Sequence, residues 1–204
     1  MVGDPELIEQ YAHIHASRVY GATSVKNLRF LRPEIRLRRP RSILDYGCGQ
    51  SRLLDELDLG YPVILHRYDP AIPDYAKKPE GAVDLLLNID VLEHIEEEDL
   101  DRVLAEMRAA CRDAIIIVDT RPASAILPDG RNAHVTLRPP AWWRDKLAEV
   151  FGSLEPVRTV RRSRAGFKTW RRGSAETLRY HAMRALEDAS HYAGRVARLG
   201  RRGD

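Results

Sequence analysis

The sequence predicts an α/β protein built on a buried, mostly parallel sheet. Short apolar runs flanked by acids, typical of strands covered on two faces, alternate with stretches of helical periodicity. The first run ends in the turn Asp45-Tyr46-Gly47-Cys48-Gly49, and the next ends in Asp69, roughly 20 residues beyond the glycines. A strand, a glycine turn and an acid at this distance are together typical of a nucleotide-type cofactor site.

Two helices are expected ahead of the glycine turn. Apolar residues recur at near-helical spacing from Leu7 to Val19, with a glycine after them, and predict a helix over residues 5–20. A second helix is predicted over 25–37, with an interruption at Pro33.

The glycine turn predicts close approach of a ligand to the backbone. Gly47 and Gly49 can take backbone angles that are closed to other residues, and a helix carrying three leucines over 53–57 is expected to present unpaired N–H groups just after them. Arg52 stands where a dinucleotide fingerprint has its third glycine, which argues against NAD.

Strands and helices alternate through the rest of the chain, which defines the α/β class. A long, proline-containing connection over 120–140 interrupts the alternation, and connections of this length inside a domain are usually functional or disordered. The expected elements are strands over 63–69 and 83–89, a helix over 100–111, a strand over 114–119, a helix over 142–151, a hairpin of 154–162 with 167–172 that turns at 163–166, and a last helix capped by Ser174.

Composition excludes several classes of protein. The chain has 204 residues, of which 44% are hydrophobic and 31% charged, as expected of one globular domain. No apolar run approaches the roughly 18 residues of a membrane span, and the first residues lack signal-peptide features, so a cytoplasmic location is expected. Cys48 and Cys111 are the only cysteines, too few for a disulfide framework or a cysteine-rich zinc site.

Two motifs in order resemble the class I S-adenosylmethionine-dependent methyltransferases. Asp45-Tyr46-Gly47-Cys48-Gly49 matches their D-x-G-x-G turn, and Asp90-Val91-Leu92-Glu93-His94-Ile95 matches a segment common among them, so the resemblance covers about residues 41–160. It implies a Rossmann-like, doubly wound sheet of seven strands, with S-adenosylmethionine across the central switch point. It also implies an N-terminal helical lid over 1–40, a methyltransferase domain over 41–173 and an appended basic helix over 174–204.

The resemblance assigns the cofactor contacts, with Asp69 as the acid that binds the ribose hydroxyls. About 14 residues separate Asp69 from Val83, too few for the family's usual helix plus strand, so its acidic adenine contact is not identifiable. The lid supplies two further candidates that reach the methionine end or the acceptor. The predicted cofactor residues are Asp45, Tyr46, Gly47, Cys48, Gly49, Asp69, Pro70, Asp90 and Val91, with His13 and Tyr20 from the lid.

Glu93, His94 and His134 are the catalytic candidates, and two interpretations of them stay open. Together, and with Asp90 as a further candidate, they are the residue types that hold a divalent cation such as Mg²⁺, which lowers the pKa of an acceptor hydroxyl. This pattern resembles the metal-using branch of the family, which includes ubiquinone-pathway O-methyltransferases and small-RNA ribose methyltransferases. Alternatively, Glu93-His94 closes the strand end without metal, and His94 acts as a general base.

The sequence therefore predicts methyl transfer to an oxygen atom of a small-molecule acceptor. Residues 156–204 carry 13 Lys and Arg against four Asp and Glu, a net charge of +9, although the whole chain has a formal net charge of +3. Because of this basic segment, an RNA methyltransferase remains open as an alternative. The last helix could also form a homodimer. A non-catalytic module that binds a partner is the remaining alternative.

Overall fold

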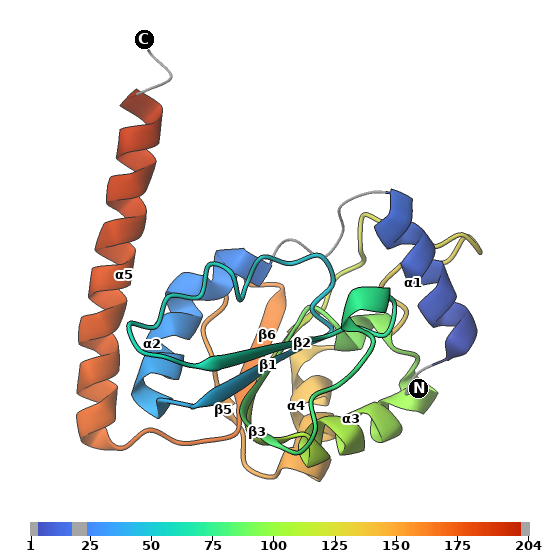
Figure 1. The fold of residues 1–204 in the computed structure, drawn as a ribbon, viewed down its shortest axis with the longest axis horizontal. Helices are drawn as coiled ribbons and strands as arrows, with labels where there is room; N and C mark the ends of the chain where they lie inside the picture. Colours follow the sequence, from blue (N-terminus) through green and yellow to red (C-terminus); the bar gives the residue numbers. More distant parts are fainter. Residues whose placement is uncertain (1–3, 18–23, 201–204) are drawn as a thin grey trace.

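The computed structural model describes residues 4–17 and 24–200, with side chains as far as residue 193 (Figure 1). Helices and strands alternate along most of the chain, as the apolar pattern predicts. In order, the elements are α1 (Pro5–Ser17), η1 (Ser24–Asn27), α2 (Leu28–Arg38), β1 (Ser42–Tyr46), β2 (Ile64–Tyr68), η2 (Pro73–Tyr75), β3 (Val83–Ile89), η3 (Leu92–His94), η4 (Glu97–Asp99), α3 (Leu100–Ala109), β4 (Cys111–Asp119), α4 (Pro140–Phe151), β5 (Glu155–Pro156), β6 (Arg164–Lys168) and α5 (Ser174–Gly200).

The described strands form one sheet in the order β2-β1-β3-β4-β6-β5. β1 to β4 run parallel, whereas β6 is antiparallel to both β4 and β5. The sheet thus has six strands, and the predicted number of seven is corrected. The physical reason is chain length: the stretch between β2 and β3 is folded as turns and the short η2, so no strand forms beyond β2 and that strand is left at the edge.

The helix predicted directly after the glycine turn is absent. Residues 53–56 form a single turn, in which the Glu56 N–H donates to the Arg52 carbonyl at 3.0 Å. The leucines that predicted the helix are nevertheless buried, since Leu53, Leu54 and Leu57 pack into the core as an irregular loop. A helix N-terminus therefore does not contribute to ligand binding here.

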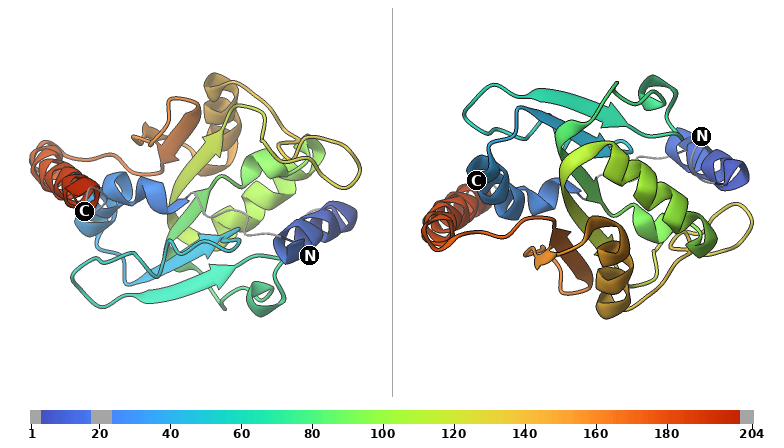
Figure 2. Two further views of the ribbon diagram at one scale, coloured as in Figure 1. Left: turned by 90° about the horizontal axis from the view of Figure 1, so that it is seen from above. Right: turned by 90° about the horizontal axis from the view of Figure 1, so that it is seen from below.

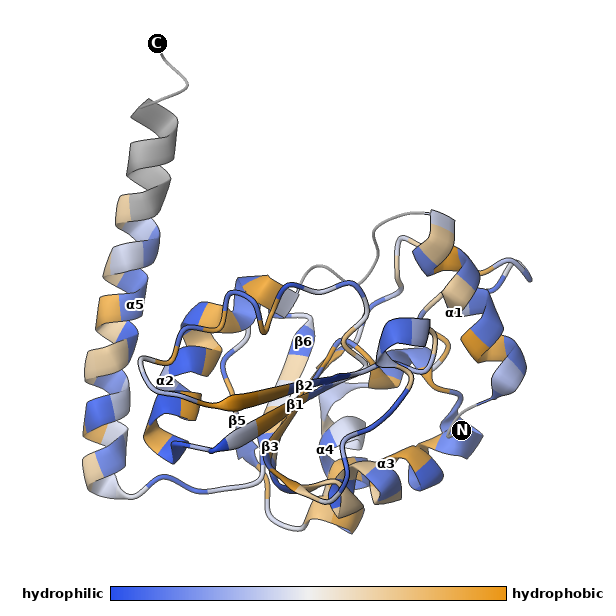
Figure 3. Ribbon diagram, in the orientation of Figure 1, coloured by the Kyte–Doolittle hydropathy of each residue, from blue (hydrophilic) through white to orange (hydrophobic). Residues whose placement is uncertain are grey.

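Helices cover the sheet on two faces, so the parallel strands are buried (Figure 2). Alternate side chains of β3 and β4 point to opposite faces, as strand geometry requires. Leu86 and Ile116 pack with α3 and α4, whereas Leu85 and Ile115 pack with α2 and the leucine loop. The hydropathy colouring shows the same division, with hydrophobic strands inside and mixed helix surfaces outside (Figure 3).

Two further predictions about elements need correction. Pro33 lies inside α2 without ending it, since the helix continues to Arg38. The hairpin turn predicted at 163–166 lies earlier, because residues 164–166 already belong to β6 and the pairing joins Glu155 to Lys168. No helix among the described residues is long and apolar enough to cross a membrane.

A buried ion network ties β6 to α2. The Glu34 carboxylate accepts hydrogen bonds from Lys168 Nζ and from Arg172 Nη1, each at 2.7 Å, and the side chains of Glu34 and Lys168 are each 1% exposed. Burial lowers the pKa of Lys168, while the Glu34 carboxylate opposes that shift. α5 then packs on the outside of α2, where Glu187 pairs with Arg32 and Arg36.

The Glu34 network generates a stability prediction. Glu34→Ala should lower the free energy of unfolding by about 3 to 5 kcal/mol, because it strands buried cationic groups without their partner. Urea denaturation followed by circular dichroism measures the change. Asp145→Ala is the matched control, since the Asp145 side chain is 70% exposed beside Arg144 and its loss should cost less than about 0.5 kcal/mol. Equal effects of the two variants would contradict the role given to Glu34.

Candidate active site

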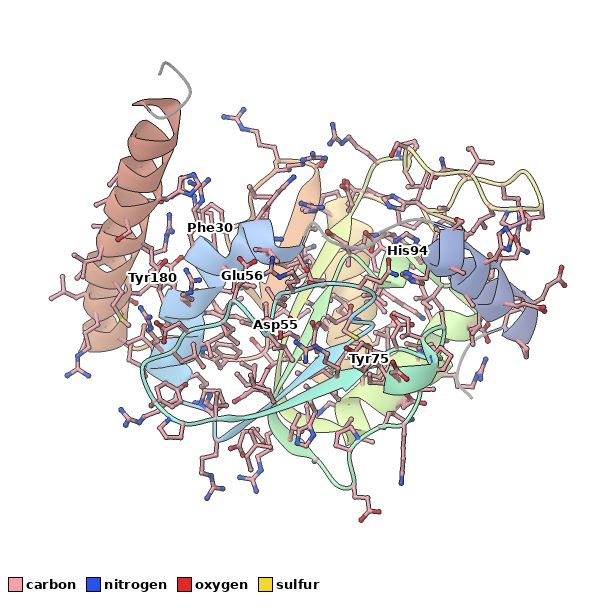
Figure 4. All side chains as sticks on the ribbon, turned by 45° about the horizontal axis from the view of Figure 1, so that its top comes forward. Phe30, Asp55, Glu56, Tyr75, His94 and Tyr180 are labelled. Atoms are coloured by element: carbon pink, nitrogen blue, oxygen red, sulfur yellow. The ribbon has the colours of Figure 1, made fainter. Side chains whose placement is uncertain are left out.

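A cavity of about 720 Å³ opens at the carboxyl ends of β1, β2, β3 and β4. Its volume lies in the range of small-molecule sites. One wall is formed by the glycine turn and Asp69, another by the segment after β3, and the rest by α1 and by loops around His134 and Arg164. His94 lies between the sheet and α1 (Figure 4).

The glycine turn is closed by backbone hydrogen bonds and by tight packing. Gly47 has φ +77°, and the carbonyl of Tyr68 in β2 accepts from the N–H of Gly47 at 2.7 Å and of Cys48 at 3.1 Å. A Cβ at Gly47 would lie 2.5 Å and 2.6 Å from the two methyl carbons of Val91. Only a glycine therefore fits this position, by conformation and by space.

The Asp69 carboxylate orders the glycine-turn side of the cavity. It accepts from the N–H of Gly49 at 2.8 Å through Oδ2 and from the N–H of Ala71 at 2.9 Å through Oδ1. Each carboxylate oxygen offers two lone pairs, so both can still accept from a ligand hydroxyl. Gly49 and Asp69, which are 20 positions apart in the sequence, are thus in direct contact.

The residues predicted to bind the cofactor separate into two groups. Tyr46, Gly47, Gly49, Asp69, Pro70, Asp90 and Val91 line the cavity, whereas Asp45 and Cys48 are buried and do not. Asp45 is buried, its Oδ2 has no hydrogen-bond partner among the described residues, and burial raises its pKa to about 7.

Asp90 is held in an uncommon conformation by two contacts. Its φ is +57°, a left-handed value that is rare outside glycine. The Asp90 N–H donates to the Ile117 carbonyl at 2.8 Å, and its Oδ2 accepts from Arg164 Nη2 at 2.5 Å. Arg164 Nε also lies 3.8 Å from Asp119 Oδ2, so one buried guanidinium faces two acids.

Glu93, His94 and His134 converge, as the sequence predicts. One potential ligand atom of each lies within 4.8 Å of the others, and the two imidazole rings meet edge to face with centroids 4.8 Å apart. His94 Nδ1 contacts the Ala133 carbonyl at 2.8 Å, and His134 Nδ1 contacts the Arg121 carbonyl. A carbonyl only accepts, so each Nδ1 carries the proton and each Nε2 bears the lone pair of the ring.

The burial of this cluster shifts two of its pKa values. Seclusion from water, followed by the neighbouring His134, lowers the pKa of His94 to about 3, so its imidazole is neutral at pH 7. Burial, followed by repulsion from Asp90, raises the pKa of Glu93 well above its ordinary value. Glu93 Oε1 accepts from the Asp119 N–H at 3.0 Å, while Oε2 has no partner among the described residues.

The N-terminal helix reaches the cavity through residues other than the predicted one. Tyr11 and His15 line the cavity, whereas His13 is exposed on another face of α1 and does not. The Tyr11 hydroxyl lies 3.1 Å from His94 Nδ1 and donates to the Ala133 carbonyl at 2.5 Å. Tyr20 lies outside the described residues.

Besides Tyr11 and His15, four charged residues at or beyond the end of β4 line the cavity without having been predicted from the sequence. Asp119 ends β4 just as Asp69 follows β2, so its position at the end of a predicted strand was a sufficient signal to predict it. Arg121, Arg161 and Arg164 lie on the loops and strand beyond it, where no local pattern distinguishes them from surface arginines.

The comparisons agree with this geometry. A family model described as a methyltransferase domain matches residues 13–189. The chain belongs to this methyltransferase family. No curated protein sequence matches it significantly.

Several solved structures share the methyltransferase fold at low sequence identity. An O-methyltransferase family protein from Burkholderia thailandensis is 14% identical with a TM-score of 0.53, over 71% of this chain and 55% of the other. This chain thus spans little more than half the length of that protein. The 1,6-didemethyltoxoflavin-N1-methyltransferase of the same organism, with its substrate and S-adenosylhomocysteine bound, is 14% identical with a TM-score of 0.56, over 82% and 89% of the two chains.

A DhpI–SAH complex is 16% identical with a TM-score of 0.50, over 79% of this methyltransferase and 95% of DhpI. The predicted class I, S-adenosylmethionine-dependent methyltransferase is thereby confirmed. The ubiquinone-pathway branch stays a prediction.

Gly47 offers a test of the cofactor turn in the methyltransferase. Gly47→Ala should weaken binding of S-adenosylhomocysteine at least about tenfold, or about 1.4 kcal/mol, because the new Cβ displaces Val91 from the cavity wall. Gly60→Ala is the matched control: Gly60 has φ +75° but open space around its Cβ, so this variant should lose about 1 kcal/mol of stability and no affinity. Isothermal titration calorimetry measures both, and an equal loss of affinity would exclude crowding as the cause.

Proposed function

We propose that this protein methylates an oxygen atom of a small-molecule acceptor. The observation that carries the proposal is the convergence of one ring nitrogen each of His94 and His134 with a carboxylate oxygen of Glu93, within 4.8 Å of one another, in the cavity that the glycine turn also lines. Methyl transfer requires two reactants held in line and a proton removed from the acceptor. The two walls of this cavity divide these tasks between them.

The cofactor side fits S-adenosylmethionine, which supplies the methyl group when bound. Asp69 has oxygen lone pairs available for the ribose hydroxyls, and the turn at Gly47 allows close approach of a ligand to the backbone. Asp90 and Val91 form the adjoining wall. Two structural neighbours are complexes with S-adenosylhomocysteine or SAH, which supports the same assignment.

The acceptor side fits a divalent cation held by Glu93, His94 and His134. The low pKa of His94 makes its ring a poor proton acceptor but a good neutral ligand, and Glu93 Oε2, which has no hydrogen-bond partner among the described residues, offers a carboxyl oxygen that would bind a cation on losing its proton. Each histidine donates its other ring N–H to a backbone carbonyl, an arrangement typical of metal-binding histidines. A cation bound there would lower the pKa of an acceptor hydroxyl.

Methylation of RNA through the basic segment is less well supported. Three cationic side chains that suggested a nucleic-acid surface are used internally: Arg164 faces Asp90, while Lys168 and Arg172 bind Glu34. Cations engaged in this way are not available to neutralise phosphates. The size of the cavity also favours a small acceptor.

The N-terminal segment acts, in this proposal, as the lid of the site. α1 packs its apolar face on the long connection, where Leu7 and Ile14 contact Ala125, Leu127 and Ala133. Gln10 also donates to Asp129 at 3.0 Å. The helix and the connection can therefore move together as one cover over the acceptor.

The homodimer through α5 remains a prediction, for which Leu178 and Leu186 offer an apolar surface, being 75% and 69% exposed.

The proposed activity is tested with S-adenosylmethionine and a panel of phenols, catechols and matching anilines. We expect O-methylated products by mass spectrometry, and none from Asp69→Ala, whose affinity for S-adenosylhomocysteine should fall by about 1 to 3 kcal/mol. The exposed Asp74, five positions on, is the control, because Asp74→Ala should change neither. Methylation of the anilines alone would contradict the assignment to oxygen.

The metal assignment is tested by Mn²⁺ titration monitored by electron paramagnetic resonance. One Mn²⁺ should bind to the chelator-treated protein, and His134→Ala should weaken that binding at least about tenfold, the usual effect of disturbing a metal ligand or its support, while affinity for S-adenosylhomocysteine persists. His181→Ala on the exposed face of α5 is the control. If the wild-type protein binds no Mn²⁺ and EDTA leaves turnover unchanged, the histidines act without a cation.

A further inference from the structure

Two arginines on the rim of the cavity have no acidic partner. Arg121 and Arg161 line the cavity and are exposed, and no hydrogen bond or ion pair of either guanidinium is found among the residues that the structure describes. The third arginine of the cavity, Arg164, faces Asp90 and Asp119. The rim therefore carries two positive charges that internal structure does not use.

Backbone contacts hold these two arginines at the same part of the rim. Thr120, next to Arg121, donates to the Ser163 carbonyl through its N–H at 2.9 Å and its hydroxyl at 2.7 Å. The Arg161 carbonyl accepts from the Arg164 N–H at 3.1 Å, which fixes the start of β6 beside the end of β4. Both positions thus flank one junction of two paired strands.

This junction adjoins the histidine pair. The Arg121 carbonyl accepts the hydrogen bond from His134 Nδ1, so the backbone of Arg121 orients the imidazole that faces His94. The two rim arginines and the two histidines therefore line the same cavity, so one ligand can contact both.

Four of the acids that line the cavity already have cationic partners. Glu96 pairs with Arg131, and Asp99 pairs with Arg102, in addition to the pairs that Arg164 makes. The charge on Arg121 and Arg161 is left for a ligand.

We propose that the acceptor carries an anionic group, a carboxylate or a phosphoryl group, which binds to Arg121 and Arg161 while the methylated hydroxyl faces the histidines. Guanidinium groups bind such planar or tetrahedral anions through paired charge-assisted hydrogen bonds. The inference rests on the proposed function and adds the chemical class of its substrate.

Calorimetric titration of the full-length protein, loaded with S-adenosylhomocysteine, tests this inference with three probes. Benzoate and phenyl phosphate carry the two anionic groups, and benzamide is the neutral match. At least one anion should bind about tenfold more tightly than benzamide, and the double variant Arg121→Gln, Arg161→Gln should remove that preference, as expected for losing charge-assisted hydrogen bonds. The anion that binds identifies which of the two groups the site takes.

Arg162→Gln is the matched control, because Arg162 is exposed beside Arg161 but does not line the cavity. It should keep the preference for the anion. Equal affinity for the three probes, no binding of either anion at millimolar concentration, or an equal loss in the Arg162 variant would overturn the inference. If the wild-type protein does not bind S-adenosylhomocysteine, the proposed function itself is overturned, so the two failures are distinguishable.

Discussion

The parallel alignment of β1 to β4 is the constraint on which the site depends. It brings the carboxyl ends of four strands to one edge of the sheet, where Gly47, Asp69, Asp90 and Asp119 meet although they come from distant parts of the chain. β6 runs antiparallel and so begins where β4 ends, which delivers Arg164 to the same edge. The buried Glu34 network holds the far end of β6 against α2, and thereby fixes the position of that arginine.

The site concentrates opposite charges in a small, partly secluded volume. Asp90, Glu93 and Asp119 would repel one another if all were ionised, and Arg164 compensates for two of them. A left-handed non-glycine residue such as Asp90 costs about 1 to 2 kcal/mol, and its ion pair and backbone hydrogen bond offset that cost. Strain and charge are thus balanced locally, beside the pair of histidines that lines the same cavity.

The sequence predicted those parts of the fold that depend on local pattern. The strand over 83–89 was predicted with correct bounds, because a run of buried apolar residues flanked by acids has few other interpretations. The leucines at 53–57 predicted burial correctly and helix wrongly, since a hydrophobic pattern does not distinguish a helix from a packed loop. Tyr11 lines the cavity and the predicted His13 does not, because residues two positions apart on a helix point to different faces. Arg164 was not predictable, since its partners are distant in sequence.

The short connection between β2 and β3 also changes what the molecule presents to other chains. With β2 at the border of the sheet, one side of its backbone has no neighbour among the described strands, and Ile64 and Leu65 are 62% and 39% exposed. Such a border is a template for intermolecular strand pairing and aggregation. The strand has only five residues, and Arg67 within it binds Asp55. Brevity and a charged side chain are the usual protections of an edge strand, so substitutions that lengthen β2 or remove Arg67 would favour self-association over solubility.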